Sequence, residues 1–487
     1  MKKVFYIILF FLIFLSFNVY AYPQGDVDGD GIVRSNDYIL IRKHILKIIE
    51  LSGNQRVRAD VNGDGIVSSL DYIAIRKIII GGGSVISTPT PTANPSTKIT
   101  AQFINSDTSA SSETIKEISC YAIDNNGCNI TIPNLSVNTN YQFLGWNTDS
   151  KLKEAKYLPN NTLLIKNDIT LYAIVPKIIT ITFNVSDNVA GKNVKAEKFA
   201  FTYTDTNGNT VIEKEGIDNI STTCLSFNNE GCKINKLPVI YAKGYMVHGY
   251  SKTIGGKNMS ATTTTFKEDT TIYARVGYYN SIEIGYANIA YQKLYGSMML
   301  EIETGISQTY INKVVSTLDK IYLYYPEVFY PGGKIFILNS NTYNRILKNA
   351  YSQINTTAGH SITATNYNNC FIRVDSDLNS MMETLVHEMG HSFDNTFGKY
   401  ISDTQELNDL YNKYKNMNNR PFRSYTYSNN MEFVADIFSA TISNLMYQKT
   451  GEYIHSYFHN IPSDISALIV SNLSSKRSNY KNIGLIK

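Results

Sequence analysis

A duplicated acidic segment near the start of the chain constrains its fold more than any other feature. Residues 26–37 read DVDGDGIVRSND, and residues 60–71 read DVNGDGIVSSLD. Each copy has oxygen-bearing side chains at positions 1, 3, 5 and 12 and a glycine at position 6, where a calcium-binding loop needs its ligands and its sharp turn. Position 7, Ile32 or Ile66, can offer its backbone carbonyl. The spacing therefore predicts two calcium ions, each bound by one short loop.

The candidate calcium ligands differ slightly between the two loops. Position 9 is Arg34 in the first loop, which cannot bind a cation, and Ser68 in the second. Position 12 is aspartate in both loops, shorter than the glutamate of an EF-hand. The candidate ligands are Asp26, Asp28, Asp30 and Asp37 in the first loop and Asp60, Asn62, Asp64, Ser68 and Asp71 in the second.

The whole segment 22–82 resembles a type I dockerin. The continuation DYIxIRK predicts one helix after each loop, and no helix is expected before either loop. With the duplication, this is the order of type I dockerins, small helical modules that dock onto a cohesin module of a scaffold protein. The resemblance assigns the contacts to loop positions 10 and 11 and to basic residues of the helices, here Ser35, Asn36, Arg42, Lys43, Ser69, Leu70, Arg76 and Lys77.

Two questions about this module stay open on sequence alone. A duplicated calcium-binding module with no cohesin partner is the alternative to a dockerin. At the two contact positions the loops share serine at position 10 but differ at position 11, Asn36 in one and Leu70 in the other, so the cohesin is not identified.

The segments that flank the calcium loops predict an exported protein. Residues 1–21 begin with two lysines, continue with an apolar run and end in Val-Tyr-Ala, as a cleaved secretory signal peptide does. An uncleaved N-terminal anchor is the alternative. Residues 83–97 are rich in serine, threonine and proline, which predicts an extended linker. We expect an extracellular or scaffold-associated protein without stable membrane insertion.

A second, weaker duplication spans residues 98–177 and 178–277. The sequence TLYAIV at 170–175 corresponds to TIYARV at 271–276, and each copy has a pair of nearby cysteines. Alternating apolar and polar residues with Asn-Gly turns predict strands and hairpins. These segments resemble the small β repeats of Gram-positive surface proteins, such as internalin-type B-repeats. The resemblance implies two all-β modules that act as spacers or binding modules.

The cysteines allow more than one arrangement. Four cysteines have three possible connectivities, and the duplication favours the local pairs Cys120–Cys128 and Cys224–Cys232. An oxidising exterior permits these bonds, and free thiols are the alternative. Cys370 lies in a strand-like run and is expected to be a buried residue rather than a nucleophile.

Residues 280–487 contain the sequence HEMGH at 387–391. Positions i and i+4 lie on one face of a helix, so His387 and His391 can bind one metal ion. Glu388 can take a proton from a water that zinc has made more acidic. Ser380 and Glu383 predict a capping box at the start of this helix. Gly390 is a poor helix former, and its expected benefit is close backbone packing beside the site.

A third ligand is expected from the sequence NMEFVAD at 430–436, because a catalytic zinc usually has three protein ligands. Glu432 is the candidate, on a helix that Asn429 caps. Asp436, one turn later, can hydrogen-bond the outer nitrogen of a ligand histidine. Tyr425 can donate to the oxyanion that forms when water attacks a peptide carbonyl.

Taken together, HExxH, EFxAD and the tyrosine seven residues before its glutamate resemble the lethal-factor-like gluzincins, which include the clostridial Pro-Pro endopeptidases. The resemblance implies an α+β zincin-like domain with one zinc bound by His387, His391 and Glu432. It also implies Glu388 as the base and Tyr425 as the transition-state donor. An acidic residue three positions after the second histidine also matches the family, which gives Asp394 a supporting role. A loop or helix-end residue is its ordinary interpretation, and an HExxH on a metal-free surface helix is the alternative for the motif.

Other parts of this region are less specific. Helical spacing runs from Tyr291 to Leu318 and from Thr342 to Ala350, and strand-like runs occupy residues 334–338 and 370–374. One of these strands could pair with an extended substrate. Gly359-His360 is expected in a polar loop. His455 and His459 repeat the i, i+4 spacing but lack an intervening glutamate, so we expect them to be structural.

The chain of 487 residues is too long for one core, and its net charge of +4 gives no case for nucleic acid binding. We therefore expect a multidomain protein with a small α-helical calcium-binding dockerin, all-β repeats and an α+β catalytic domain. The predicted function is that of a secreted zinc metalloendopeptidase, tethered to a cohesin-bearing scaffold, that acts on protein or peptide substrates. A non-catalytic surface or adhesion component and a toxin-like protease acting on host protein are the alternatives.

Overall fold

The computed structural model describes twelve stretches of the chain. They are residues 23–80, 97–113, 115–122, 126–189, 192–279, 282–283, 285–350, 359–364, 367–374, 377–396, 399–457 and 459–487. The predicted signal peptide and nearly all of the predicted linker lie outside these residues. The chain divides into two compact units, one of residues 1–97 and 122–126 and the other of residues 98–121 and 127–487. In the described residues, no helix is both long and apolar enough to cross a bilayer.

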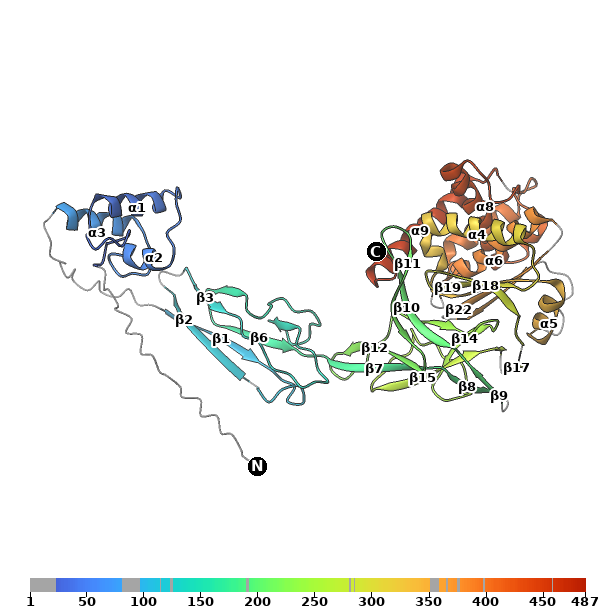
Figure 1. Ribbon diagram of the computed structural model, residues 1–487, viewed down its shortest axis with the longest axis horizontal. Coiled ribbons are helices and arrows are strands. Elements are labelled where there is room, and N and C mark those ends of the chain that lie inside the picture. Colours follow the sequence, from blue (N-terminus) through green and yellow to red (C-terminus); the bar gives the residue numbers. More distant parts are fainter. Residues whose placement is uncertain are drawn as a thin grey trace, which may run out of the picture. The chain divides into compact units, whose positions relative to one another are not determined.

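The first unit contains the two calcium loops and three helices, α1 (Ser35–Ile45), α2 (Gly53–Ala59) and α3 (Ser69–Ile80). Helices α1 and α3 follow the two loops and lie side by side (Figure 1). Ile41 of α1 and the equivalent Ile75 of α3 are both fully buried in a small apolar core. The expectation that no helix precedes a loop is wrong for the second loop. The short helix α2 ends there, with Ala59 buried in the same core.

The duplication of the β modules is visible in their sheets. The first module has the strands β1 (Thr97–Ile104), β2 (Ile115–Ala122), β3 (Cys128–Thr131), β4 (Gly145–Asn147), β5 (Thr162–Ile165) and β6 (Ile169–Ile174). Its main sheet has the order β2-β1-β6-β4, with β1 and β6 parallel. The second module repeats this order as β12-β7-β15-β14, again with a parallel central pair.

The strands of the second module are β7 (Lys177–Asn184), β8 (Ser186–Val189), β9 (Lys192–Lys195), β10 (Lys198–Thr204), β11 (Thr210–Gly216), β12 (Asn219–Ser226), β13 (Val239–Tyr241), β14 (Val247–Ser251) and β15 (Thr270–Val276). Strands β10, β11 and β13 form an extra sheet. The central strands β1 and β7 share one burial pattern, in which every second residue is buried, because one face of each sheet covers a core. Both predicted disulfides, Cys120–Cys128 and Cys224–Cys232, are present.

The C-terminal region is built on a five-stranded sheet of order β18-β19-β20-β22-β21. Its strands are β18 (Ile289–Tyr295), β19 (Met298–Glu303), β20 (Gly333–Leu338), β21 (Gly359–Ala364) and β22 (Tyr367–Arg373). Its helices are α4 (Gln308–Tyr324), α5 (Ser340–Ala350), α6 (Leu378–Asp394), α7 (Gln405–Lys415), α8 (Asn430–Thr450) and α9 (Ser463–Asn482). Three short 3₁₀ helices among the described residues cover Pro326–Phe329, Ile401–Asp403 and Ser424–Tyr427. Two-residue strands form two further pairs, β16 (Tyr278–Tyr279) with β17 (Ile282–Glu283) and β23 (Asn395–Thr396) with β24 (Lys399–Tyr400).

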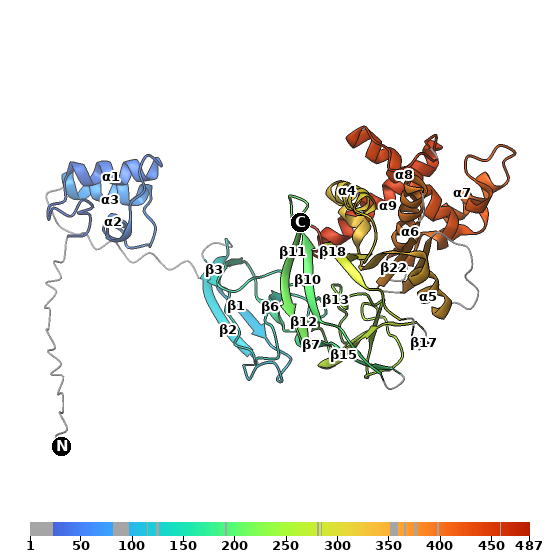
Figure 2. The same ribbon diagram turned by 45° about the vertical axis from the view of Figure 1, so that its right-hand side comes forward.

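The two faces of this sheet pack against different helices. In β20, Ile335 and Ile337 belong to the large core shared with α4, α6 and α8, whereas Phe336 and Leu338 belong to a second core shared with α5. This alternation follows from the two-residue period of a strand. Figures 1 and 2 both show α4, α6 and α8 together above the sheet. The helices that carry HEMGH and NMEFVAD therefore rest on a buried sheet on one side.

Two expectations for this region need correction. The segment Tyr291–Leu318 is not one helix, because its first part forms the hairpin β18–β19 and only Gln308–Tyr324 is helical. Every residue of β19 is buried, including Glu301 and Glu303, and Gly296 has a φ of +59° at the hairpin turn. The apolar run at residues 298–300 therefore belongs to a buried strand and not to a helix face. The predicted strands at 334–338 and 370–374 are central strands, not edges. The two edges of the sheet are β18 and β21, and Gly359-His360 lies in β21 rather than in a loop.

The second β module is packed against the C-terminal region and is not a free spacer. Lys334 and Glu301 form an ion pair of 2.7 Å, and their side chains are 1% and 0% exposed. The Lys334 ammonium also donates to the carbonyl of Ala242, and Glu301 accepts from the backbone N–H of Gly244 at 2.9 Å. A buried charge needs such partners because an unpaired one is costly. The module and the region that contains HEMGH therefore share a satisfied polar interface.

Candidate metal centre and calcium loops

Helices α6 and α8 bring the three candidate zinc ligands together. His387 Nε2 lies 3.1 Å from Glu432 Oε2, and His391 Nε2 lies 3.6 Å from the same oxygen. The three ligand atoms all lie within 4.8 Å of one another. The side chains of His387, His391 and Glu432 are 7%, 15% and 17% exposed, so the group is largely desolvated but open on one side.

This donor set fits zinc. Two imidazole nitrogens and one carboxylate oxygen are the three protein ligands of many catalytic zinc sites. With bonds of about 2.0–2.1 Å, ligand atoms of a tetrahedral site lie about 3.3 Å apart, and the observed 3.1 and 3.6 Å bracket that separation. Burial lowers the pKa of His387, but hydrogen bonds to Asp436 and Glu432 outweigh it and raise the pKa to about 10. The surrounding carboxylates therefore favour positive charge at this point.

The close contact of the two helices depends on Gly390. A Cβ at this position would lie 2.7 Å from Cα of Ala435 and 2.8 Å from its carbonyl oxygen. The backbones thus approach more closely than any side chain allows. The expected role of Gly390 in close packing is confirmed. The cap of α8 is also as expected, since the Asn429 side chain accepts from the backbone N–H of Glu432 at 3.0 Å.

Glu388 points into a buried space beside the edge strand β21. Desolvation raises the pKa of its carboxyl group above the ordinary value. Its Oε2 atom is buried and has no hydrogen-bond partner among the described residues. A Cβ added to Gly359 of β21 would lie 2.7 Å from Glu388 Oε1, and the hydroxyl of Ser361 donates to the Glu388 carbonyl at 3.0 Å. A buried polar atom without a hydrogen-bond partner in the protein needs a partner from outside it. A water molecule whose proton Glu388 accepts would supply that partner.

Asp436 lies behind the metal centre, where the sequence led us to expect it. His387 Nδ1 donates to Asp436 Oδ1 at 2.6 Å, which leaves Nε2 to face Glu432. Asp436 is fully buried. Burial raises the pKa of Asp436, but the hydrogen bond from His387 outweighs it and lowers the pKa to about 2. A carboxylate in this place fixes the tautomer and the orientation of a ligand imidazole.

Tyr425 lies at the open side of the centre. Its side chain is half exposed, and its ring centroid lies 6.4 Å from that of His387. Desolvation and the charge of Glu432 raise the pKa of the phenol well above its ordinary value. The hydroxyl therefore keeps its proton at neutral pH and can donate.

Asp394 does not reach the candidate ligands. Its carboxylate accepts from the backbone N–H of Ser402 at 2.7 Å and from the Ser402 hydroxyl at 2.6 Å. No hydrogen bond joins Asp394 to His387 or His391 among the described residues. The expected supporting role at the metal is not seen, because the carboxylate fixes the turn after α6 instead.

The start of α6 also differs from expectation. The cap is Asp377, which accepts from the backbone N–H groups of Asn379 and Ser380 at 3.1 and 3.0 Å, so Ser380 and Glu383 form no capping box. Glu383 instead forms an ion pair of 2.8 Å with Arg423. Sequence reasoning missed Arg423. The only signal was the number of acidic side chains on two otherwise apolar helices, which need compensating positive charge.

The three remaining reactive side chains behave as structural groups, as expected. Burial raises the pKa of the Cys370 thiol to about 12, so it is not a nucleophile at neutral pH. His455 is buried against the hydroxyl of Ser439 at 3.0 Å, and burial lowers its pKa to about 4. The ring of His459 lies tilted against that of Tyr453, with their centroids 3.8 Å apart.

The first calcium loop folds around Asp26 and Asp37. The Asp26 carboxylate accepts from the backbone N–H groups of Gly29 and Gly31 at 2.9 and 2.8 Å, and Asp37 accepts from those of Asp28 and Arg34, both at 2.9 Å. Carboxylate oxygens of Asp26, Asp28 and Asp37 lie within 4.8 Å of one another. Burial and the charges of Asp37 and Asp26 raise the pKa of Asp28, which is a repulsion that a cation relieves. Asp30 is the exception, because it forms an ion pair with Arg34.

The second loop repeats this arrangement. Asp60 accepts from Asp64 and Gly65 at 3.0 and 2.7 Å, and Asp71 accepts from the backbone N–H groups of Asn62 and Ser68 at 3.1 and 2.7 Å. Oxygens of Asp60, Asp64 and Asp71 converge within 4.8 Å. All eight residues expected to contact a cohesin are exposed, at equivalent places on α1 and α3.

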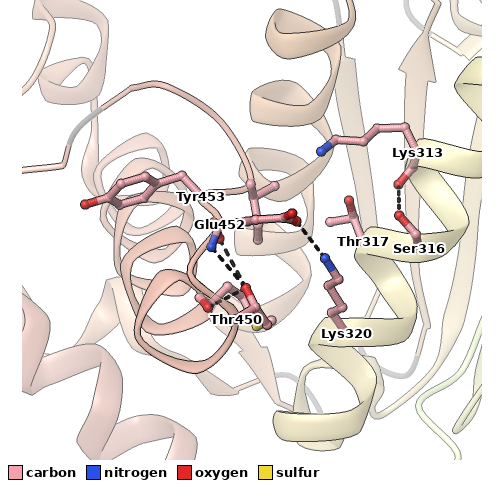
Figure 3. A pocket seen from close by; sticks show the side chains of 9 residues that line it. Lys313, Ser316, Thr317, Lys320, Thr450, Glu452 and Tyr453 are labelled. Carbon is pink, nitrogen blue, oxygen red and sulfur yellow. Dashed lines mark hydrogen bonds and ion pairs between the residues drawn. The ribbon is translucent and has the colours of Figure 1, made fainter.

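A cavity of about 40 Å³ lies elsewhere, between α4 and the end of α8 (Figure 3). Lys320 reaches across its mouth to Glu452 at 2.8 Å. No residue that lines it belongs to the metal centre. Its volume is that of one or two water molecules, so it offers no room for a peptide.

Comparison with known families covers the N-terminal part of the chain. Residues 24–80 match the dockerin type I domain, and residues 100–174 match the Listeria-Bacteroides repeat domain. No curated protein matches the chain. The first match confirms the dockerin, a calcium-binding module that attaches proteins to cohesins of extracellular scaffolds, and the second confirms the first β repeat. Both matches end before HEMGH, so the interpretation of the metal centre depends on its geometry.

Proposed function

We propose that the chain is a secreted zinc metalloendopeptidase that is tethered through its dockerin to a cohesin-bearing extracellular scaffold, as in a cellulosome. One observation supports the catalytic part of this proposal. Two imidazoles from α6 and one carboxylate from α8 converge at ligand distances next to a buried glutamate with an unpartnered oxygen. A structural zinc site would have a fourth protein ligand and no such glutamate.

Each residue of the candidate metal centre has a separate role in the proposed peptide hydrolysis. Zinc bound by His387, His391 and Glu432 would polarise the scissile carbonyl and lower the pKa of water to about 7. Glu388 takes the proton of that water and delivers it to the leaving amine, and its raised pKa favours this exchange. Tyr425, which stays protonated, donates a hydrogen bond to the oxyanion of the tetrahedral intermediate.

Strand β21 is the best candidate for binding the substrate backbone. It lies at the edge of the sheet, antiparallel to β22, and it contacts α6 through Gly359 and Ser361. An extended peptide can add to such an edge as a further strand. The scissile bond would then lie beside Glu388. By resemblance to the Pro-Pro endopeptidases, a proline-rich peptide is one candidate substrate.

The proposal is tested with the full-length secreted protein and a peptide library. We expect zinc-dependent cleavage, and we expect Glu388→Gln to keep its zinc and to lose activity by about 10²- to 10⁴-fold. Glu406→Gln, an exposed glutamate at the start of α7, is the matched control and should cleave normally. Normal turnover by Glu388→Gln would refute the role of the base. A zinc-loaded wild type that cleaves nothing would favour a non-catalytic scaffold component.

A further inference from the structure

One carboxylate, that of Asp436, serves two parts of the metal centre. Its Oδ1 atom accepts the hydrogen bond from His387 Nδ1 at 2.6 Å. The same side chain accepts from the hydroxyl of Thr426 and from the guanidinium of Arg423, with distances of 2.9 Å to Nη2 and 3.3 Å to Nε. Asp436 therefore connects a metal ligand on α6 to the turn before α8.

That turn carries Tyr425, and its two anchors bracket the tyrosine. Arg423 lies two residues before Tyr425, and Thr426 follows it directly. The guanidinium carbon of Arg423 also lies 5.7 Å from the centroid of the Tyr425 ring, at cation–π distance. The place of this half-exposed ring is thus set by the residues on either side of it rather than by burial.

Arg423 also reaches the helix that carries both histidines. Its Nη2 atom lies 2.8 Å from Oε1 of Glu383, one helical turn before His387. Glu383 and Asp436 are both buried carboxylates. Burial and the charge of Asp436 raise the pKa of Glu383, and the charge of Arg423 opposes this increase. Without a cation between them, two desolvated carboxylates would repel each other and move apart.

We propose that Arg423 is a positioning residue of the metal centre, which holds Tyr425 and the His387–Asp436 pair in one geometry by joining the turn at 424–427 to α6 and α8. This inference rests on the proposed function. A surface ion pair would need only a positive charge at this position. The positioning role needs the planar guanidinium of arginine, because this one rigid group donates three hydrogen bonds to two carboxylates. Lysine at 423 keeps the charge but cannot make these bonds together.

The first test does not depend on activity. Zinc affinity is measured for Arg423→Lys by competition with a chelating dye, and backbone amide exchange is measured for residues 424–427. We expect zinc to bind about 10- to 100-fold more weakly and the turn to exchange faster than in the wild type. Arg420→Lys is the matched control, since Arg420 is exposed in the same segment and lies over the ring of Tyr427, and no hydrogen bond joins it to Asp436 or Glu383 among the described residues. Unchanged zinc affinity and exchange in Arg423→Lys would overturn the proposal.

The second test separates positioning from general stability. With a peptide that the wild type cleaves, we expect Arg423→Lys to lower kcat about 10- to 100-fold. In a Tyr425→Phe background the same substitution should lower kcat far less, because the group that it positions is already gone. An equal loss in both backgrounds would contradict the positioning of Tyr425 by Arg423. If the wild type shows no zinc-dependent cleavage, the proposed function fails, but the zinc-affinity and exchange measurements still decide the role of Arg423.

Discussion

The calcium loops and the candidate metal centre position their carboxylates in opposite ways. Each calcium loop takes all its side chains from twelve consecutive residues, and backbone N–H groups of the same loop hold the carboxylates. The metal centre takes two ligands from α6 and one from α8, and ion pairs from a third segment support it. Asp26, Asp37 and Asp71 of the loops are fully buried and the remaining loop ligands are half-buried or exposed, whereas His387, His391 and Glu432 are all buried or half-buried. A calcium loop is thus determined by a short stretch of sequence, whereas the candidate metal centre is formed only when the domain is folded.

This difference decides what each site responds to. We expect a loop that loses its ion to affect only its own module, because the hydrogen bonds that hold its buried carboxylates come from backbone N–H groups of the same loop. The metal centre depends on the distance between two helices, and Gly390 sets that distance against Ala435. The second β module also contributes indirectly, since Asn369 of β22 donates to the carbonyl of Val247 at 2.7 Å while its neighbour Cys370 lies against α6. Changes far from the ligands should therefore reach the metal centre and not the loops.

Chelation gives the largest expected effect. A strong chelator should abolish both peptide cleavage and cohesin docking, because it removes zinc and calcium together. Zinc added alone should restore cleavage without docking, and calcium added alone should restore docking without cleavage. Cleavage assays and cohesin pull-downs on the same sample measure both. Recovery of cleavage with calcium alone would mean that the two sites are not chemically distinct.

Removal of one ligand from the metal centre comes next. Glu432→Ala should lose zinc and cleavage, since two imidazoles alone bind zinc far more weakly than three ligands do. Elemental analysis should still find two calcium ions per chain. Glu406→Ala, which changes an exposed glutamate, is the matched control. Full zinc content in Glu432→Ala would point to a different third ligand.

The equivalent change in a calcium loop should stay local. Asp71→Ala removes the carboxylate that accepts from Asn62 and Ser68, so one calcium ion of two should be lost. Calcium content and cohesin affinity should fall, while zinc content and peptide cleavage stay within about twofold. A loss of cleavage in this variant would show that the dockerin and the C-terminal region are coupled. It would contradict the expectation that the calcium loops and the candidate metal centre respond independently.

The smallest predicted change is at the helix contact. Gly390→Ala adds one methyl group where there is no space, which should destabilise the fold by about 1–3 kcal/mol and push α6 from α8. We expect a lower melting temperature together with weaker zinc binding, measured by calorimetry and dye competition. Weaker folding with unchanged zinc affinity would mean that the ligand distances do not depend on this contact.

The same contrast explains what could be predicted from the sequence. The calcium loops, the cap at Asn429 and the roles of Cys370 and Gly390 follow from local patterns, because spacing in one segment determines them. The capping box at Ser380 was wrong because Asp377 lies three residues earlier and caps the helix first. Arg423 was missed because its partners lie 13 and 40 residues away, and only the fold brings them together. Edge strand β21 was missed because its sequence, GHSITA, shows no apolar run.

The identity and ligands of the bound metal test the central claim most directly. Zinc K-edge X-ray absorption and anomalous diffraction on the zinc-loaded protein measure both. We predict one zinc per chain at about 2.0–2.1 Å from Nε2 of His387 and His391 and from a carboxylate oxygen of Glu432. Zinc bound elsewhere, or a chain that binds no zinc when both histidines are intact, would contradict the account.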